Sequence, residues 1–275
     1  MAIERCFNID PQTARRLINE TKHMTNDKSG ESNFYQTKTY LFDEYAVLRM
    51  QNMLYRNVST SDADLKHLEN IAMTLLDLQA TGINVVPILA YQCDNGTGYM
   101  VQPRAKGAEL YDREKMNDPT YVLSRVAMLA AAPQVHYDRF VADIIAIVDA
   151  GILIDFMGKD NFFYDASCGF QFIDLNAHDD HVYGLTDMKP QGKQVAAFGG
   201  FLPCYYDIAS HYRDTVTSLL ASLTAAQRTA LIQNNKAIFE QCKSALVHNG
   251  VEQQAINDML SHERFIPQKQ VLGLV

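Results

Sequence analysis

The stretch 151–174 constrains the chain most, because it places three oxygen-bearing side chains around one short predicted hairpin. Residues 161–173 contain two aromatic, aliphatic runs separated by a polar turn, which is the pattern of two antiparallel strands. Asn161 and Asp174 stand at the open ends of this hairpin, and antiparallel pairing brings such ends together. Asp155 lies on the loop that leads into it. Because Mg2+ prefers carboxylate, carbonyl and water oxygens, we expect these side chains to hold that ion.

The overall composition limits both the fold and the partners. With 275 residues, 47% of them hydrophobic, the chain can bury one large core or the cores of two lobes. The net charge is -8 and no basic stripe with interleaved aromatic residues occurs, so we expect no nucleic-acid partner. The five cysteines are scattered singly, as in a reducing cytoplasm. The sequence shows no signal-peptide core and no apolar run of roughly 18 residues, so we expect a cytoplasmic protein without a membrane span.

Hydrophobic periodicity divides the chain into a strand-rich first part and a mainly helical remainder. A polar, turn-rich loop is expected at 25–33. The predicted strands are 34–42, 45–50, 83–91, 98–102, 161–164 and 170–173. The predicted helices are 10–21, 61–80, 120–132, 136–150, 205–223, 225–250 and 251–262.

The residues around the hairpin resemble the catalytic and metal-binding loops of the protein-kinase-like superfamily. That family has the pattern H-R-D-x-x-x-x-N, then a hairpin, then Asp-Phe-Gly. The resemblance implies that Asp155 is the catalytic residue, which orients or deprotonates an acceptor hydroxyl. It also implies that Asn161 and Asp174 hold Mg2+.

The match departs from the family pattern at three places. Residues 153–154 are Leu-Ile where the family has His-Arg, and residues 175–176 are Leu-Asn where it has Phe-Gly. One extra residue also separates Asp155 from Asn161. Asp160, which falls at the family's spacing, is therefore a competing choice for the metal ligand.

Residues 45–49 resemble the Val-Ala-Ile-Lys strand of the same family, with Arg49 in the lysine position. In that family the cation holds the α- and β-phosphates, and a glutamate on the next helix holds the cation. Glu69, inside the predicted helix 61–80, suits the second role. Lys38, on the preceding predicted strand, is the alternative to Arg49.

Residues 99–110 resemble the strand and hinge that hold adenine in kinases. The resemblance implies that Gln102, Arg104 and Glu109 contact the nucleotide, with Glu109 at the ribose. Pro103 has no N–H, so the hinge offers one backbone donor fewer.

A further match lies downstream, at residues 206–212. It resembles the Asp-Ile-Ala/Gly-x-His-Phe pattern of choline and ethanolamine kinases, and it implies that Asp207 braces the catalytic loop.

Together these matches imply an α+β, two-lobed protein-kinase-like fold. A small lobe, a β-sheet with one main helix, is expected over 1–102, a hinge over 103–106, and a mostly helical large lobe over 107–275. ATP and Mg2+ are expected between the lobes, with transfer of the γ-phosphate to a hydroxyl of an unidentified small molecule or protein. The missing His-Arg and Phe-Gly and the arginine in place of lysine favour an alternative, a nucleotide-binding or scaffold pseudokinase. A third possibility is an unrelated α+β protein whose acidic hairpin is surface decoration.

Overall fold

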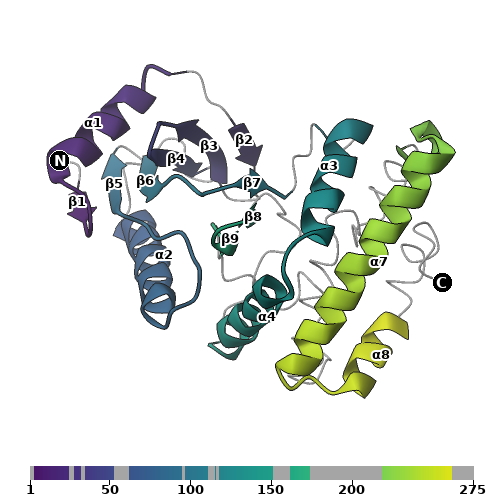
Figure 1. Ribbon diagram of the computed structural model, residues 1–275. Helices are drawn as coiled ribbons and strands as arrows, with labels where there is room; N and C mark the ends of the chain where they lie inside the picture. Colours follow the sequence, from purple (N-terminus) through teal and green to yellow (C-terminus); the bar gives the residue numbers. More distant parts are fainter. Residues whose placement is uncertain are drawn as a thin grey trace. The chain divides into compact units, whose positions relative to one another are not determined.

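The computed structural model describes residues 3–24, 28–31, 35–52, 62–94, 97–110, 115, 118–150, 162–173 and 219–261. The chain forms two compact units, Met1–Ala105 and Lys106–Val275. In the described residues, the first unit is a sheet with two helices and the second is mostly helical (Figure 1). The functional roles expected of 1–102 and 103–106 stay predictions. No helix in the described ranges is both long and apolar enough to cross a membrane.

The first unit is built on a six-stranded sheet in the order β1-β5-β6-β4-β3-β2, in which all neighbours are antiparallel. Its strands are β1 Ile3–Cys6, β2 Lys28–Glu31, β3 Tyr35–Leu41, β4 Tyr45–Asn52, β5 Ala90–Asp94 and β6 Thr97–Pro103. Because side chains alternate along a strand, each strand presents one set of residues to each face of this sheet.

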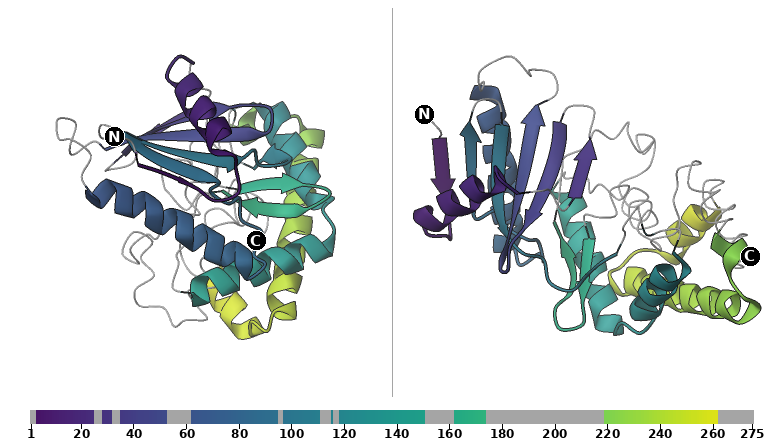
Figure 2. Two further views of the ribbon diagram at one scale, coloured as in Figure 1. Left: turned by 90° about the vertical axis from the view of Figure 1, so that its left-hand side faces the viewer. Right: turned by 90° about the horizontal axis from the view of Figure 1, so that it is seen from above.

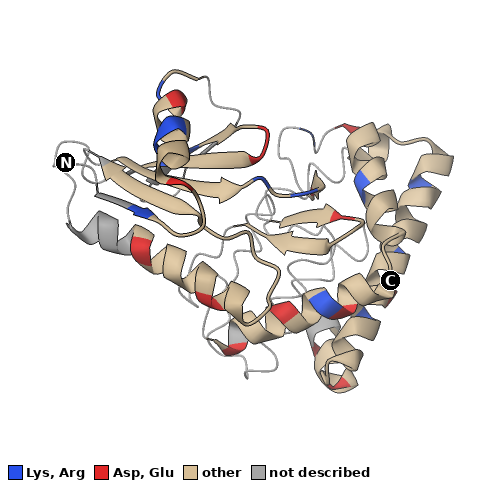
Figure 3. Cartoon of the chain, turned by 60° about the vertical axis from the view of Figure 1, so that its left-hand side comes forward, with Lys and Arg blue, Asp and Glu red and all other residues tan. Residues whose placement is uncertain are grey.

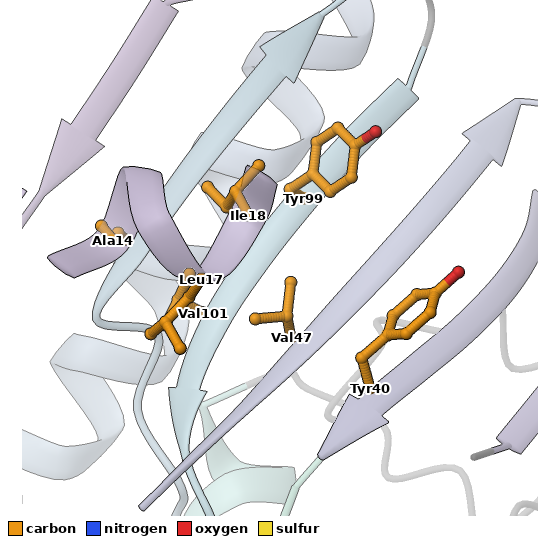
Figure 4. Close-up of a cluster of buried hydrophobic side chains, with 8 residues drawn as sticks. Ala14, Leu17, Ile18, Tyr40, Val47, Tyr99 and Val101 are labelled. Carbon is orange, nitrogen blue, oxygen red and sulfur yellow. The ribbon is translucent and has the colours of Figure 1, made fainter. Parts of the chain in front are cut away.

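Helix α1, Pro11–Thr21, covers one face of the sheet (Figure 2). It begins where the side chain of Asp10 accepts a hydrogen bond from the Thr13 N–H, with Pro11 in the first turn. The helix and the central strands share one apolar cluster, much of which Figure 4 shows: Ala14, Leu17, Ile18, Tyr40, Val47, Ala90, Tyr99 and Val101. Burial of this cluster fixes which strand residues lie on the α1 face.

Helix α2, Asp62–Ala80, covers the opposite face (Figure 2). A Cβ added at Gly98 of β6 would lie 2.8 Å from Leu68 Cδ1, so the helix packs directly on the backbone of that strand. After α2 the chain turns at Gly82, whose φ of 89° lies in the left-handed region that favours glycine. The Ile83 N–H donates to the Leu78 carbonyl across this turn.

The second unit combines a three-stranded sheet, in the order β7-β8-β9, with four described helices. Its elements are β7 Ala108–Glu109, α3 Pro119–Ala130, α4 Gln134–Asp149, β8 Phe162–Asp165, β9 Gly169–Phe172, α7 Ala225–His248 and α8 Gln253–Ser261. Helix α7 packs against both α3 and α4. Thr224 begins α7 with a capping box completed by Gln227.

Three sequence expectations for the elements need correction. The predicted strand 83–91 is wrong over most of its length, since only Ala90–Asp94 forms a strand; Pro87, which lacks an N–H, interrupts the segment before it. The loop expected at 25–33 contains a strand, β2, paired with β3. Strands β1 and β7 were not expected, because segments this short show no clear alternation.

Candidate functional site

The β8–β9 hairpin packs against α4 through a cluster of buried aromatic rings. Phe140 of α4 stacks on Phe172 with ring centroids 5.2 Å apart and an interplanar angle of 15°. It also contacts Phe170 at 4.6 Å and Phe162 at 6.0 Å, and Phe162 lies edge-on to Phe172. All four side chains are buried. Such ring pairs add to the stabilisation from burial, so this hairpin is tightly packed on α4 within the second unit.

The closed end of the hairpin is fixed by polar contacts. Tyr164 and His136 of α4 share a hydrogen bond of 3.0 Å between the phenol oxygen and Nδ1. Burial, with a smaller effect of the Asp165 charge, raises the pKa of Tyr164. The turn itself is held by Asp165, whose carboxylate accepts hydrogen bonds from the hydroxyl and backbone N–H of Ser167. These hydrogen bonds lower the pKa of Asp165.

The other face of the three-stranded sheet carries a different set of residues. The register pairs Glu109 of β7 with Phe163 of β8, and Phe163 with Gln171 of β9, so the three share one face. All three are half-buried, unlike the aromatic residues on the α4 face. The Gln171 Oε1 accepts a hydrogen bond of 2.9 Å from the Lys106 N–H, which ties the start of the second unit to the hairpin. This face offers a partly exposed aromatic ring beside a carboxylate, a combination suited to a flat base and hydroxyl groups.

The expected catalytic and metal-binding residues fall beside this hairpin in the sequence. Asn161 directly precedes β8, and Asp174 follows the end of β9 by two residues. Asp155, Asn161, Asp174 and the competing Asp160 all lie outside the described residues, as does Asp207. Within the described ranges, no group of three His, Cys, Asp or Glu side chains is arranged to hold a metal ion. The expected roles of these five residues stay predictions.

The residues expected in the hinge have defined partners. Gln102 is buried and its Nε2 donates to the Val86 carbonyl at 3.3 Å. The Arg104 backbone N–H donates to the Glu44 carbonyl at 2.8 Å, and its guanidinium to the Phe42 carbonyl at 3.4 Å. Residue 103 is a proline.

These partners limit what the hinge can offer to a ligand. Arg104 is not the backbone donor that a ligand can use, because its N–H already has an acceptor. In the described part of the chain, the Ala105 N–H forms no hydrogen bond and is the remaining hinge donor before Lys106. The expected contacts of Gln102 and Arg104 with nucleotide stay predictions.

The structure does not bring Arg49 and Glu69 together as expected. Arg49 is two residues after Val47 and directly opposite Tyr99. Val47 and Tyr99 both belong to the apolar cluster beneath α1. Arg49 therefore lies on the α1 face, while Glu69 is on α2, which covers the other face. Lys38, directly opposite Arg49, shares the α1 face and cannot replace it in that pair.

Glu69 has other partners, which were not expected from the sequence. Its carboxylate lies 3.9 Å from the Arg5 Nε, in a partly exposed ion pair. It also forms a side-chain hydrogen bond with Tyr91, a buried residue of β5. Burial, reinforced by Glu69, raises the pKa of Tyr91 to about 12. The pairing of β1 with β5 places Arg5 opposite Tyr91, and only that long-range pairing identifies this cluster.

Comparisons with known proteins address the fold. No protein-family model matches the sequence, and no curated protein matches it at a significant level. Among solved structures, the chain is similar to the pseudokinase domain of BIR2, an immune regulator of the RLK/Pelle family. The TM-score is 0.50 at 11% sequence identity, covering 98% of this chain and 90% of that chain. The chain therefore has a protein-kinase-like fold, which confirms the expected α+β, two-lobed architecture.

Proposed function

We propose that the chain is an ATP- and Mg2+-dependent phosphotransferase that moves the γ-phosphate to a hydroxyl of a small molecule or protein. The observation that carries the proposal is the β8–β9 hairpin. Its buried face packs on α4 through stacked aromatic rings; its first strand begins directly after Asn161, and its second strand ends two residues before Asp174. Catalysis of phosphoryl transfer is mostly positioning and charge neutralisation, and a hairpin packed firmly on a helix serves positioning.

The nucleotide base and ribose are assigned to the half-buried face of the three-stranded sheet. Phe163 offers a ring on which a base can pack, and Glu109, its neighbour across the strands, offers a carboxylate to the ribose hydroxyls. The two groups provide one apolar surface and one acceptor, a combination common in ligand sites.

Asn161 and Asp174 fit a magnesium site by their chemistry, since an amide and a carboxylate oxygen are both ligands that this ion accepts. When bound, the ion neutralises charge on the phosphates. Asp155 accepts the proton of the acceptor hydroxyl or orients that hydroxyl toward the phosphate. A cytoplasmic location, argued from the single cysteines, belongs to the same proposal.

A second candidate function, a pseudokinase that binds nucleotide or a partner without turnover, is favoured by the position of Arg49. That side chain lies on the face of the sheet that α1 covers, and Glu69 is engaged by Arg5 and Tyr91. The neighbouring residue of β4 that lies on the α2 face is Leu48, which carries no charge. A chain without that cation lacks one of the groups that kinases use on the phosphates.

Thermal unfolding of the full chain with ATP, in the presence and absence of Mg2+, tests nucleotide binding. A ligand that binds only the folded state raises Tm, so ATP with Mg2+ should raise it and Asp174→Asn should remove the Mg2+-dependent part. Asp258→Asn, which changes an exposed carboxylate on α8, is the matched control and should respond as the wild type does. The absence of any shift with nucleotide would overturn both candidates.

Transfer of labelled phosphate, assayed against pools of metabolites and of proteins, then separates the two candidates. Phosphate transfer that Asp155→Asn abolishes supports the phosphotransferase. A nucleotide-dependent Tm shift with no transfer to either pool, or to water, would replace it by the pseudokinase.

A further inference from the structure

Three cationic side chains gather on the α1 face of the six-stranded sheet. Lys38 of β3 and Arg49 of β4 lie directly opposite each other, and Tyr99 of β6 is the next residue in the same row. Lys22, at the C-cap of α1, has its Nζ 5.9 Å from the centre of the Tyr99 ring. Side chains opposite each other on neighbouring strands have Cβ atoms about 4.5–5.5 Å apart, so Lys38 and Arg49 lie side by side, and Lys22 lies against the Tyr99 ring of the same row. We call Lys22, Lys38 and Arg49 the basic cluster.

The basic cluster lies at the border of the apolar core beneath α1. Tyr40 and Val47, which form part of that core, come two residues from Lys38 and Arg49 on the same strands and face. Lys38 and Arg49 are half-buried, so their aliphatic stems extend the core while their charges reach its edge. Figure 4 shows the Tyr40 and Tyr99 rings directed along the sheet past Val47, toward the end at which β4 finishes. Arg49 follows Val47 in that direction.

This arrangement is electrostatically unfavourable by itself. Like charges directly opposite on neighbouring strands destabilise a sheet. Within the described residues, neither Lys38 nor Arg49 takes part in an ion pair, and the nearby Glu20 of α1 is paired with Arg16 at 3.0 Å. On the opposite side of the sheet, acidic residues occur along α2, including Glu69 and Asp77, whereas α1 carries charges of both signs (Figure 3). The register also places Glu31 of β2 and Asp94 of β5 on the α1 face, so the positive charge of Lys38 and Arg49 is a local feature of that face in a chain whose net charge is -8.

We propose that the basic cluster binds a phosphate-type oxyanion, either free phosphate or the phosphate group of a phosphorylated side chain. Arg49 offers a planar fork that matches two oxygens of such an anion, and the two lysines offer point charges on either side. All three groups are donors, which is the requirement for a fully ionised tetrahedral anion. This site is distinct from the proposed nucleotide site, because Lys38 and Arg49 belong to the six-stranded sheet of the first unit, whereas Phe163 and Glu109 belong to the three-stranded sheet of the second.

The test measures the Tm of the full chain in inorganic phosphate, sulfate and phosphoserine, each against chloride at equal ionic strength. Phosphate should raise Tm more than chloride does. Arg49→Gln should weaken the phosphate affinity by about ten-fold or more, as expected for the loss of one charge-assisted hydrogen bond, and Lys38→Gln should act in the same direction. Lys236→Gln, which removes an exposed positive charge on α7, is the matched control and should leave the response unchanged.

Two further readouts separate this site from a structural role and from the nucleotide site. In chloride, Arg49→Gln should unfold at the same Tm as the wild type or higher, because it relieves repulsion with Lys38. The phosphate response should also persist in saturating ATP with Mg2+ and in Asp174→Asn. A stronger response to phosphoserine than to inorganic phosphate identifies a modified side chain as the source. An unchanged phosphate response in Arg49→Gln, or one that ATP abolishes, would overturn the proposal.

Discussion

The buried hydroxyl of Tyr91 makes the stability of the chain depend on alkaline pH. Burial is the main cause that raises the pKa of Tyr91 to about 12, and its hydrogen bond and charge interaction with Glu69 add to it. In the unfolded chain a tyrosine titrates near pH 10. Between these two pH values the unfolded chain loses the proton of Tyr91 while the folded chain retains it. The stability that this group contributes is therefore complete below about pH 10 and is lost as the pH rises through about 12.

The magnitude follows from the two pKa values. A difference of two units corresponds to about 2.7 kcal/mol in the free energy of unfolding once both states are deprotonated. At pH 11 about half of this is lost, so the contribution should fall by about 1.3 kcal/mol between pH 9 and pH 11. Tyr91 is buried, but its partners Glu69 and Arg5 are partly exposed, so solvent screening makes about 1.3 kcal/mol an upper value for the loss.

Urea unfolding of the wild type and of Tyr91→Phe at pH 9 and pH 11 measures the effect. Phenylalanine keeps the ring and lacks the titrating hydroxyl, so the difference between the two proteins isolates this one group. Glu69→Gln should lower the pKa of Tyr91 only partly, since burial remains. If the free energies of unfolding of the wild type and Tyr91→Phe change in parallel from pH 9 to pH 11, the Tyr91 hydroxyl does not have a raised pKa and its contact with Glu69 is refuted.

Three other expectations can be checked in the same way. Phe140→Ala should lower the free energy of unfolding by about 3–5 kcal/mol in urea titrations, because it empties the centre of the ring cluster; a loss below 1 kcal/mol would contradict that packing. Asp155→Asn should lower kcat by about 10²–10⁴-fold and leave ATP affinity nearly unchanged, with Asp160→Asn as the control for the loop register. Arg49→Ala and Glu69→Ala should change ATP affinity additively within about 0.5 kcal/mol, and a larger coupling would show that the two side chains meet.

The sequence predicts those parts of the fold that local chemistry decides. Asp10 followed by Pro11 indicates the start of α1, and the structure confirms it with the hydrogen bond from Thr13. The polar turn between two aromatic runs likewise predicts β8 and β9, where Gly169 has a φ of 78°. In each case the signal and the structure lie within a few residues of each other.

Long-range pairing is where prediction from sequence fails. The contact of Arg5 with Glu69 depends on β1 pairing with β5, whose partner residues are far apart in the chain. Neither strand has a sequence pattern that indicates which strand it pairs with. The face of the hairpin that carries Phe163 and Glu109 is likewise set by the pairing of β7 with β8. Asp155, Asn161 and Asp174 lie outside the described residues, so these contacts do not test their predicted roles.

The position of Arg49 shows that a shift of one residue along a strand changes which face, and therefore which function, a side chain can serve. Side chains alternate between the faces of a strand, so a shift of one position moves a charge to the other side of the sheet. Ala46, Leu48 and Met50 supply the α2 face of β4, and none of them carries a charge. If the chain transfers phosphate, Mg2+ and its ligands must neutralise charge that a cation on β4 would otherwise share. ATP affinity should then depend strongly on Mg2+ and remain nearly the same in Arg49→Gln, which is the opposite of what the linear motif alone implies.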